Sequence, residues 1–221
     1  AQYYAAVEGV DANVGRLVDE LDALGVRDET LVVYTADHGH NCGHHGVWGK
    51  GNGTAPQNVL EESIRVPLVV AGADDLVTPQ VRAEFVDHCD TFRTILDCAG
   101  VEAPDRNYPG ESYWGQLVRA EASTDREQLQ ICEYADVRMV RSEQYKLVRR
   151  LPDGPDLLFD LAADPRETRN VLGDPAHSDA RGRLSAALDD AFETYVEEGS
   201  AGVPVAELPT YNRHQAWERY D

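Results

Sequence analysis

Apolar residues recur at spacings of three and four through the first 24 residues, which is the period of an amphipathic helix lying on a sheet. The periodic residues are Val7, Val10, Val14, Leu17, Leu21 and Leu24. Gly25 is the expected stop of this helix. A continuous apolar run at residues 31–35 predicts a buried parallel strand, and residues 66–71 predict a second strand. One or more helices are expected within residues 78–98.

The pattern changes after about residue 125, where short apolar stretches alternate with turn signals. Four short strands are predicted to form an antiparallel sheet, at residues 128–134, 138–141, 145–150 and 157–160. The segment Asp164-Pro165-Arg166-Glu167 predicts a helical turn, with Asp164 as its N-cap and Glu167 reaching back to the cap. A last helix is predicted at residues 177–197, with Leu184, Leu188, Phe192 and Tyr195 on one face.

Candidate chemistry follows the first predicted strand, where a carboxylate and an imidazole stand side by side. Asp37 and His38 are the first charged or titratable residues past this strand, at the sheet edge where open α/β folds bind ligands. A turn opened by Gly39 would let both side chains reach one metal ion. The pair suits manganese, zinc or iron, and calcium accepts it if the remaining ligands are oxygens. Two ligands are too few for a catalytic metal, so others must come from elsewhere.

A glycine-rich loop after this pair adds two histidines and a lysine. Lys50 is one of only two lysines in the chain, beside eighteen arginines. Its compact ammonium can bind a tetrahedral oxyanion such as sulfate or phosphate. His45, rather than His44, could donate a hydrogen bond to the substrate or protonate a leaving oxygen. Without these neighbours, Asp37 and His38 would predict only a turn and helix cap, and Lys50 only a surface lysine.

In these segments the sequence resembles the sulfatase family of the alkaline phosphatase-like superfamily, over its whole length. The resemblance implies an α/β fold: part of an alkaline phosphatase-like sheet flanked by helices over residues 1–124, and a small C-terminal antiparallel-sheet subdomain with a packed helix over residues 125–221. The matching segments are residues 3–5, 10–17, 28–39, 43–50, 61–68, 90–101, 145–147, 158–161 and 164–167, with Asn170.

The resemblance assigns roles residue by residue. Asp37 and His38 match the family's downstream metal ligands, with calcium as the expected ion and manganese, magnesium or zinc as alternatives. Lys50 matches the lysine that contacts the sulfate group, and His45 matches a histidine whose role is substrate contact. His44 stands where the family commonly has glutamate. Enzymes of the superfamily that hydrolyse phosphonates or phosphodiesters also carry Asp-His, so that activity stays open.

The resemblance also shows what this sequence lacks. The family's nucleophile is a formylglycine made from the first residue of a Cys/Ser-x-Pro-x-Arg motif, and none of the four cysteines here begins that motif. The chain is therefore expected to be the C-terminal portion of a sulfatase, inactive alone, with the N-terminal part of the same enzyme as its partner. The substrate would be a small-molecule or glycan sulfate ester. A non-catalytic fragment that keeps the half-site as a relic is the third alternative.

The formal net charge of −20 disfavours nucleic-acid binding, because a phosphate backbone requires a basic face. Abundant acid with almost no lysine suggests adaptation to high salt, which would fit the cytoplasm of a salt-loving organism. No apolar stretch approaches the roughly 18 residues that a membrane-spanning helix needs. The sequence leaves open both export and assembly into a homo-oligomer.

Overall fold

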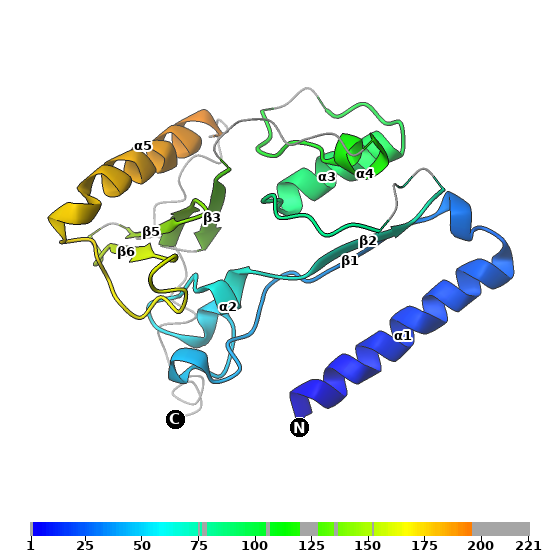
Figure 1. Ribbon diagram of the computed structural model, residues 1–221, viewed down its shortest axis with the longest axis horizontal. Helices are drawn as coiled ribbons and strands as arrows, with labels where there is room; N and C mark the ends of the chain where they lie inside the picture. Colours follow the sequence, from blue (N-terminus) through cyan, green and yellow to red (C-terminus); the bar gives the residue numbers. More distant parts are fainter. Residues whose placement is uncertain are drawn as a thin grey trace, which may run out of the picture. The chain divides into compact units, whose positions relative to one another are not determined.

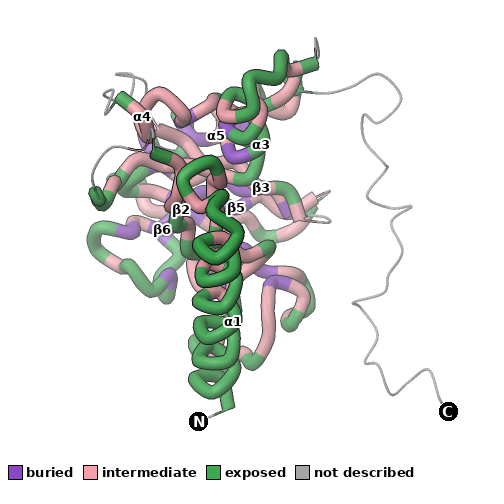
Figure 2. The backbone as a smooth tube through the Cα atoms, turned by 90° about the vertical axis from the view of Figure 1, so that its right-hand side faces the viewer, coloured by how far each residue is buried: buried purple, intermediate pink, exposed green. Residues whose placement is uncertain are grey.

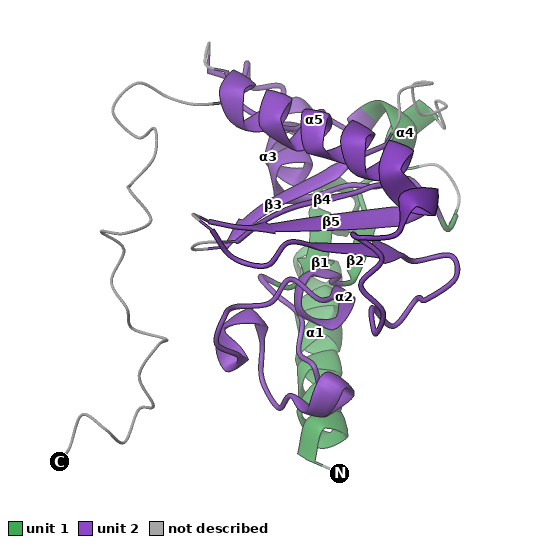
Figure 3. Cartoon of the chain, turned by 90° about the vertical axis from the view of Figure 1, so that its left-hand side faces the viewer, with its two compact units in different colours: residues 1–36, 67–81, 115–121 green, residues 37–66, 82–114, 122–221 purple. Residues whose placement is uncertain are grey.

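The computed structural model describes residues 2–74, 76, 79–104, 107–119, 128–134, 137–151 and 153–195. Contacts within the chain define two compact units, which Figure 3 colours separately. The first comprises residues 1–36, 67–81 and 115–121, and the second comprises residues 37–66, 82–114 and 122–221. The domain boundary predicted between residues 124 and 125 lies outside the described residues.

The first unit begins with α1 (Gln2–Leu24), the helix predicted from the apolar spacing (Figure 1). Gly25 ends it with a φ of 70°, and the amide of Val26 donates to the carbonyl of Leu21, which closes the helix end as a Schellman-type turn. No residue of α1 is buried, and Figure 2 shows most of the helix as exposed. Of the predicted apolar stripe, Val14 and Leu21 are half-buried, whereas Val7, Val10, Leu17 and Leu24 are exposed.

Two strands follow α1, but their pairing differs from the prediction. After the 3-10 turn η1 (Arg27–Glu29), β1 (Leu31–Thr35) pairs antiparallel with β2 (Leu68–Gly72), and none of their residues is buried. The prediction of a buried parallel strand at residues 31–35 is wrong for these described strands. An apolar run suits a strand with a partner in either direction, so hydrophobicity alone does not set the direction of pairing.

The second unit is built around a four-stranded antiparallel sheet in the order β3-β4-β5-β6, as the sequence predicts. Its strands are β3 (Gln130–Tyr134), β4 (Val137–Arg141), β5 (Tyr145–Arg150) and β6 (Leu157–Asp160). The helices of this unit are α2 (Glu61–Ile64), α3 (His88–Cys98) and α5 (Ser178–Thr194), while α4 spans Trp114–Arg119. Three 3-10 turns complete it: η2 (His44–Gly46), η3 (Gly51–Gly53) and η4 (Pro175–His177).

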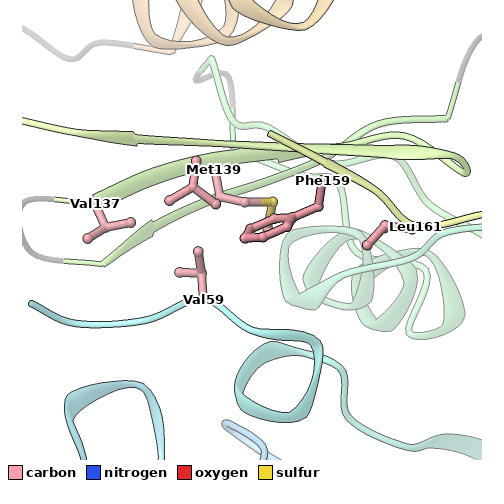
Figure 4. Close-up of a cluster of buried hydrophobic side chains, with 6 residues drawn as sticks. Val59, Val137, Met139, Phe159 and Leu161 are labelled. Atoms are coloured by element: carbon pink, nitrogen blue, oxygen red, sulfur yellow. The ribbon is translucent and has the colours of Figure 1, made fainter. Parts of the chain in front are cut away.

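Side chains alternate across this sheet, so each face buries a separate cluster. One face packs Val140, Leu147 and Leu158 against Val171 and against Leu184 and Leu188 of α5, with Phe192 beside them. This confirms three residues of the predicted helix face, whereas Tyr195 lies past the end of α5 and is 38% exposed. The other face packs Val137, Met139, Val148 and Phe159 against Leu161 and Val59. Figure 4 shows Val59 pointing at this second face from the loop before α2. The sheet thus anchors the segment that follows the candidate site loop.

The turn at residues 164–167 forms only in part as predicted. The amide of Glu167 donates to the carbonyl of Asp164, which closes the turn, and the Asp164 carboxylate accepts from the amides of Thr168 and Arg169 just past it. Glu167 does not reach back to the cap. Its backbone has a φ of 53° and its side chain is 1% exposed, directed at Lys146 and Glu61 instead. None of the described helices combines the length and the apolar character that crossing a membrane requires.

Candidate functional site

The candidate site lies in the loop between β1 and α2, within the second unit. Gly39 fixes where this loop turns: its amide donates to the carbonyl of Ser63 at 2.8 Å. A Cβ atom at Gly39 would lie 2.0 Å from the carbonyl oxygen of Glu62, so only glycine fits there. The loop after Asp37 and His38 is therefore held directly against α2.

His38 is oriented by the backbone beside it. Its Nδ1 lies 2.8 Å from the carbonyl oxygen of Gly39, which can only accept, so Nδ1 carries the proton and donates. The lone pair is then on Nε2. In a histidine that binds a metal, one ring nitrogen usually donates its proton to a carbonyl or carboxylate, and the other ring nitrogen binds the ion.

Two charged groups meet this lone pair. The ammonium of Lys50 lies 2.9 Å from Nε2 of His38 and donates to it. The nearer carboxylate oxygen of Asp37 lies 3.5 Å from the same nitrogen. The structure therefore brings together three of the four residues that the sequence predicts for the site: Asp37, His38 and Lys50.

The donor atoms of Asp37 and His38 fit a shared divalent ion. Two ligands bound at about 2.1 to 2.4 Å to one ion lie about 3 to 3.5 Å apart, which is close to their observed separation. The Asp37 side chain is 85% exposed and the His38 side chain 39% exposed, so both are accessible. Among the described residues no group of three or more His, Cys, Asp or Glu side chains could hold a metal.

His45, the fourth predicted residue, lies on a different carboxylate. Its Nε2 is 3.6 Å from Glu62, and Nδ1 of His44 is 2.7 Å from the other oxygen of the same carboxylate. His45 adopts a left-handed backbone with a φ of 55°. Burial would raise the pKa of Glu62, but backbone and His44 hydrogen bonds and the two imidazole charges hold it below its usual range. The charged carboxylate of Glu62 is therefore favoured, and it can pair with either imidazole.

Two polar residues that the sequence reasoning missed hold the loop from inside. Asn41 is fully buried, and its amide nitrogen donates to Ser63 Oγ at 2.8 Å and to the carbonyl of Gly49 at 3.1 Å. Ser63 in turn donates to Asn58. A lone asparagine between His40 and Cys42 carries no periodic signal, so pattern reasoning had no means to single it out.

A buried charge cluster on the far end of α2 was also missed. The Lys146 side chain is 0% exposed, and its ammonium lies 2.7 Å from a carboxylate oxygen of Glu61 and 2.7 Å from one of Glu167. It also donates to the carbonyl of Val59 at 3.0 Å. Glu167 Oε1 meets the ammonium as an ion pair and accepts no aligned hydrogen bond. Burial would raise the pKa of Glu61, but Lys146 and then Arg141 hold it below its ordinary value.

A model of the sulfatase family matches residues 1–101, the part of the chain that contains Asp37, His38 and Lys50. The chain belongs to the sulfatase family. It is 30% identical over 197 residues to the ulvan-active sulfatase of Formosa agariphila. The aligned region covers 85% of this chain and 37% of that protein. The chain thus corresponds to a C-terminal portion of its relatives and spans well under half of their length.

Solved sulfatase-superfamily structures share the fold. A phosphonate monoester hydrolase from Silicibacter pomeroyi superposes with a TM-score of 0.75 at 29% identity, over 88% of this chain and 40% of that one. A protein solved with its substrate D-glucosamine-2-N,6-O-disulfate superposes with a TM-score of 0.72 at 26% identity, over 90% of this chain and 41% of that one. These matches establish the alkaline phosphatase-like fold of this chain.

Proposed function

We propose that this sulfatase chain supplies the metal-and-anion half of a site that hydrolyses sulfate esters. The observation that carries the proposal is the convergence of Asp37 and Lys50 on the Nε2 lone pair of His38. This arrangement supports a metal-binding pair and a compact cation acting at one point. A domain over residues 1–124 would hold this half-site and a subdomain over residues 125–221 would support it.

Asp37 and His38 would hold the divalent ion, with calcium as the expected ion and manganese, magnesium or zinc as the alternatives. Such an ion supplies positive charge that stabilises the charge developing on the sulfuryl oxygens. Because Nε2 has one lone pair, His38 cannot bind a metal and accept from Lys50 at once. Metal binding would free the ammonium to neutralise the sulfate group and stabilise the transition state.

His45 would contact the substrate or donate a proton to the leaving oxygen, with Glu62 holding the imidazole. The nucleophile would be the formylglycine implied by the family resemblance, supplied by residues outside this sequence. The N-terminal part of the same enzyme would therefore complete the site. The alcohol that carries the sulfate, whether a small molecule or a glycan, would be chosen by other loops.

A phosphonate or phosphodiester substrate is the second candidate, favoured by the likeness to the Silicibacter pomeroyi phosphonate monoester hydrolase. The test is the rate ratio on matched aryl esters, measured on the protein as its gene encodes it. A higher kcat/KM for the aryl sulfate than for the aryl phosphonate would support sulfate hydrolysis. The reverse ratio would assign the site to phosphonates. If neither ester is hydrolysed when metal is supplied, the result would support the alternative of a non-catalytic protein that keeps the half-site as a relic.

A further inference from the structure

The short helix α2 lies between the buried charge cluster and the candidate site. It is a single turn of four residues, too short to be stable by its own hydrogen bonds. Its first free amide, on Glu61, donates to Glu167 at 2.7 Å, and the Glu61 carboxylate lies on Lys146. Residues of β5 and of the turn at residues 164–167 therefore hold the first residue of the helix.

The next two residues of α2 hold the site loop. Glu62 contacts His44 and His45 through its carboxylate. Ser63 accepts from the amide of Gly39 at 2.8 Å and from the side chain of Asn41 at 2.8 Å. Gly39 is packed closely against α2, because a Cβ there would collide with the backbone of Glu62.

The last contact in this series is between Gly39 and the imidazole of His38. The carbonyl of Gly39 accepts from Nδ1 of His38, and this hydrogen bond decides which ring nitrogen is protonated. If Gly39 shifts, the ring loses the acceptor that keeps Nε2 free. Two hydrogen bonds thus connect α2 to the His38 ring, one from Gly39 to Ser63 and one from His38 to Gly39.

We propose that Lys146, with Glu61 and Glu167, is a positioning group that fixes the tautomer and orientation of His38 through α2, Ser63 and Gly39. Lys146 is fully buried, so it does not touch substrate. Stability alone is a poor reason for a buried cluster of three charges, because well-packed apolar residues of similar volume often stabilise a protein as much or more. Such a cluster is better explained by the geometry it imposes.

The proposal rests on the assigned role of His38 as a metal ligand, but its test requires neither metal nor turnover. A variant that combines Lys146→Met, Glu61→Gln and Glu167→Gln, called the neutral variant, keeps the shape of the cluster and removes these three charges, while the glutamine at position 61 keeps an oxygen that can accept from Arg141. The measurement is ¹⁵N NMR of the imidazole nitrogens of His38, together with hydrogen exchange at the Gly39 amide. A site that fails to hydrolyse any ester would leave this measurement unaffected.

In the wild-type protein we expect one protonated and one free ring nitrogen on His38. In the neutral variant we expect the two signals to move toward each other and the Gly39 amide to exchange about tenfold faster. The matched control is Arg149→Met with Asp189→Asn, which neutralises another ion pair of β5 that faces α5. It should leave His38 and Gly39 unchanged.

Two results would overturn the proposal. One is a folded neutral variant in which His38 and Gly39 behave as in the wild type. The other is a loss of exchange protection through β4 and β5 as large as that at Gly39, which would make the cluster a fold-stabilising group only. If the neutral variant does not fold, Glu167→Gln alone carries the test, because it keeps an acceptor for the Glu61 amide. It should shift the His38 signals in the same direction, and unchanged signals would refute the coupling.

Discussion

At the scale of single residues, the two lysines of the chain have opposite surroundings. Lys146 is fully buried among two carboxylates and a carbonyl, so its charge is neutralised within the fold. Lys50 donates to the lone pair of the His38 imidazole, and no ion pair between Lys50 and a carboxylate occurs among the described residues. Its positive charge is therefore available to an incoming anion, whereas that of Lys146 is not.

Replacing Lys50 should affect turnover strongly. We expect Lys50→Ala to lower kcat/KM for an aryl sulfate by about 10² to 10³, because it removes a preorganised cation from the developing charge. Arg166→Ala, which removes an exposed cation from a turn of the second unit, is the control and should change kcat/KM less than about twofold. Equal rates for Lys50→Ala and the control would show that Lys50 does not meet the anion.

Gly39 provides a second residue-scale prediction. Gly39→Ala forces a Cβ against the Glu62 carbonyl, and we expect it to destabilise the protein by about 1 to 3 kcal/mol. Gly182→Ala, in α5 with open space around it, should instead stabilise by about 0.5 to 1 kcal/mol. Urea unfolding midpoints compare the two. An unchanged unfolding midpoint for Gly39→Ala would show that the loop is not held against α2.

At the scale of elements, α2 joins the antiparallel sheet to the site loop. Glu61 holds one end of it through Lys146, and Ser63 holds the loop. The folded-state pKa of Glu61 is below its ordinary value of 4.5, because Lys146 and Arg141 outweigh the effect of burial. Its charge therefore contributes stability above that value, and the contribution is lost as the pH falls through the folded pKa.

This linkage predicts a pH-dependent cost for Glu61→Gln. The stability difference between wild type and Glu61→Gln should be largest above the ordinary carboxyl pKa of 4.5, and it should shrink as the pH falls below that value and the wild-type carboxyl takes up a proton. Urea unfolding of both proteins across this range measures it. A difference that stays constant with pH would show that the ion pairs of Glu61 do not stabilise the fold.

Regular periodicity explains which elements could be predicted. The helix at residues 2–24, the four strands after residue 128 and the buried face of α5 all follow from local spacing. The antiparallel pairing of β1 with β2 does not, because direction depends on how the chain returns. Glu167 was misread for a related reason. A glutamate three residues after a capping aspartate fits a capping box, and only the fold reveals a buried lysine within reach.

The candidate site was predictable only where residues adjacent in sequence act together. Asp37, His38 and Lys50 lie within one loop, and the structure brings them together. Lys146 and Glu167 reach α2 from more than 80 residues away, so no local pattern connects them. Tertiary contacts, which single-sequence patterns do not encode, decided each of these outcomes.

At the scale of the whole molecule, the net charge of −20 should make stability depend on salt. Added salt screens the repulsion among carboxylates, with a Debye length of about 10 Å at 0.1 M falling to about 3 Å at 1 M. We therefore expect the thermal midpoint to rise with KCl over this range. An equal osmolality of an uncharged osmolyte is the control, and it should produce a smaller rise. Indifference to KCl would refute adaptation to high salt.

The most direct test of the account is metal-dependent turnover of an aryl sulfate by the protein as its gene encodes it, with His38→Ala beside the wild type. We predict that chelation abolishes wild-type turnover, that a divalent ion, calcium first, restores it, and that His38→Ala binds the ion more weakly and stays inactive at ion concentrations that saturate the wild type. Wild-type turnover that survives chelation, or His38→Ala with unchanged metal affinity and rate, would contradict a metal-and-anion half-site built from Asp37, His38 and Lys50.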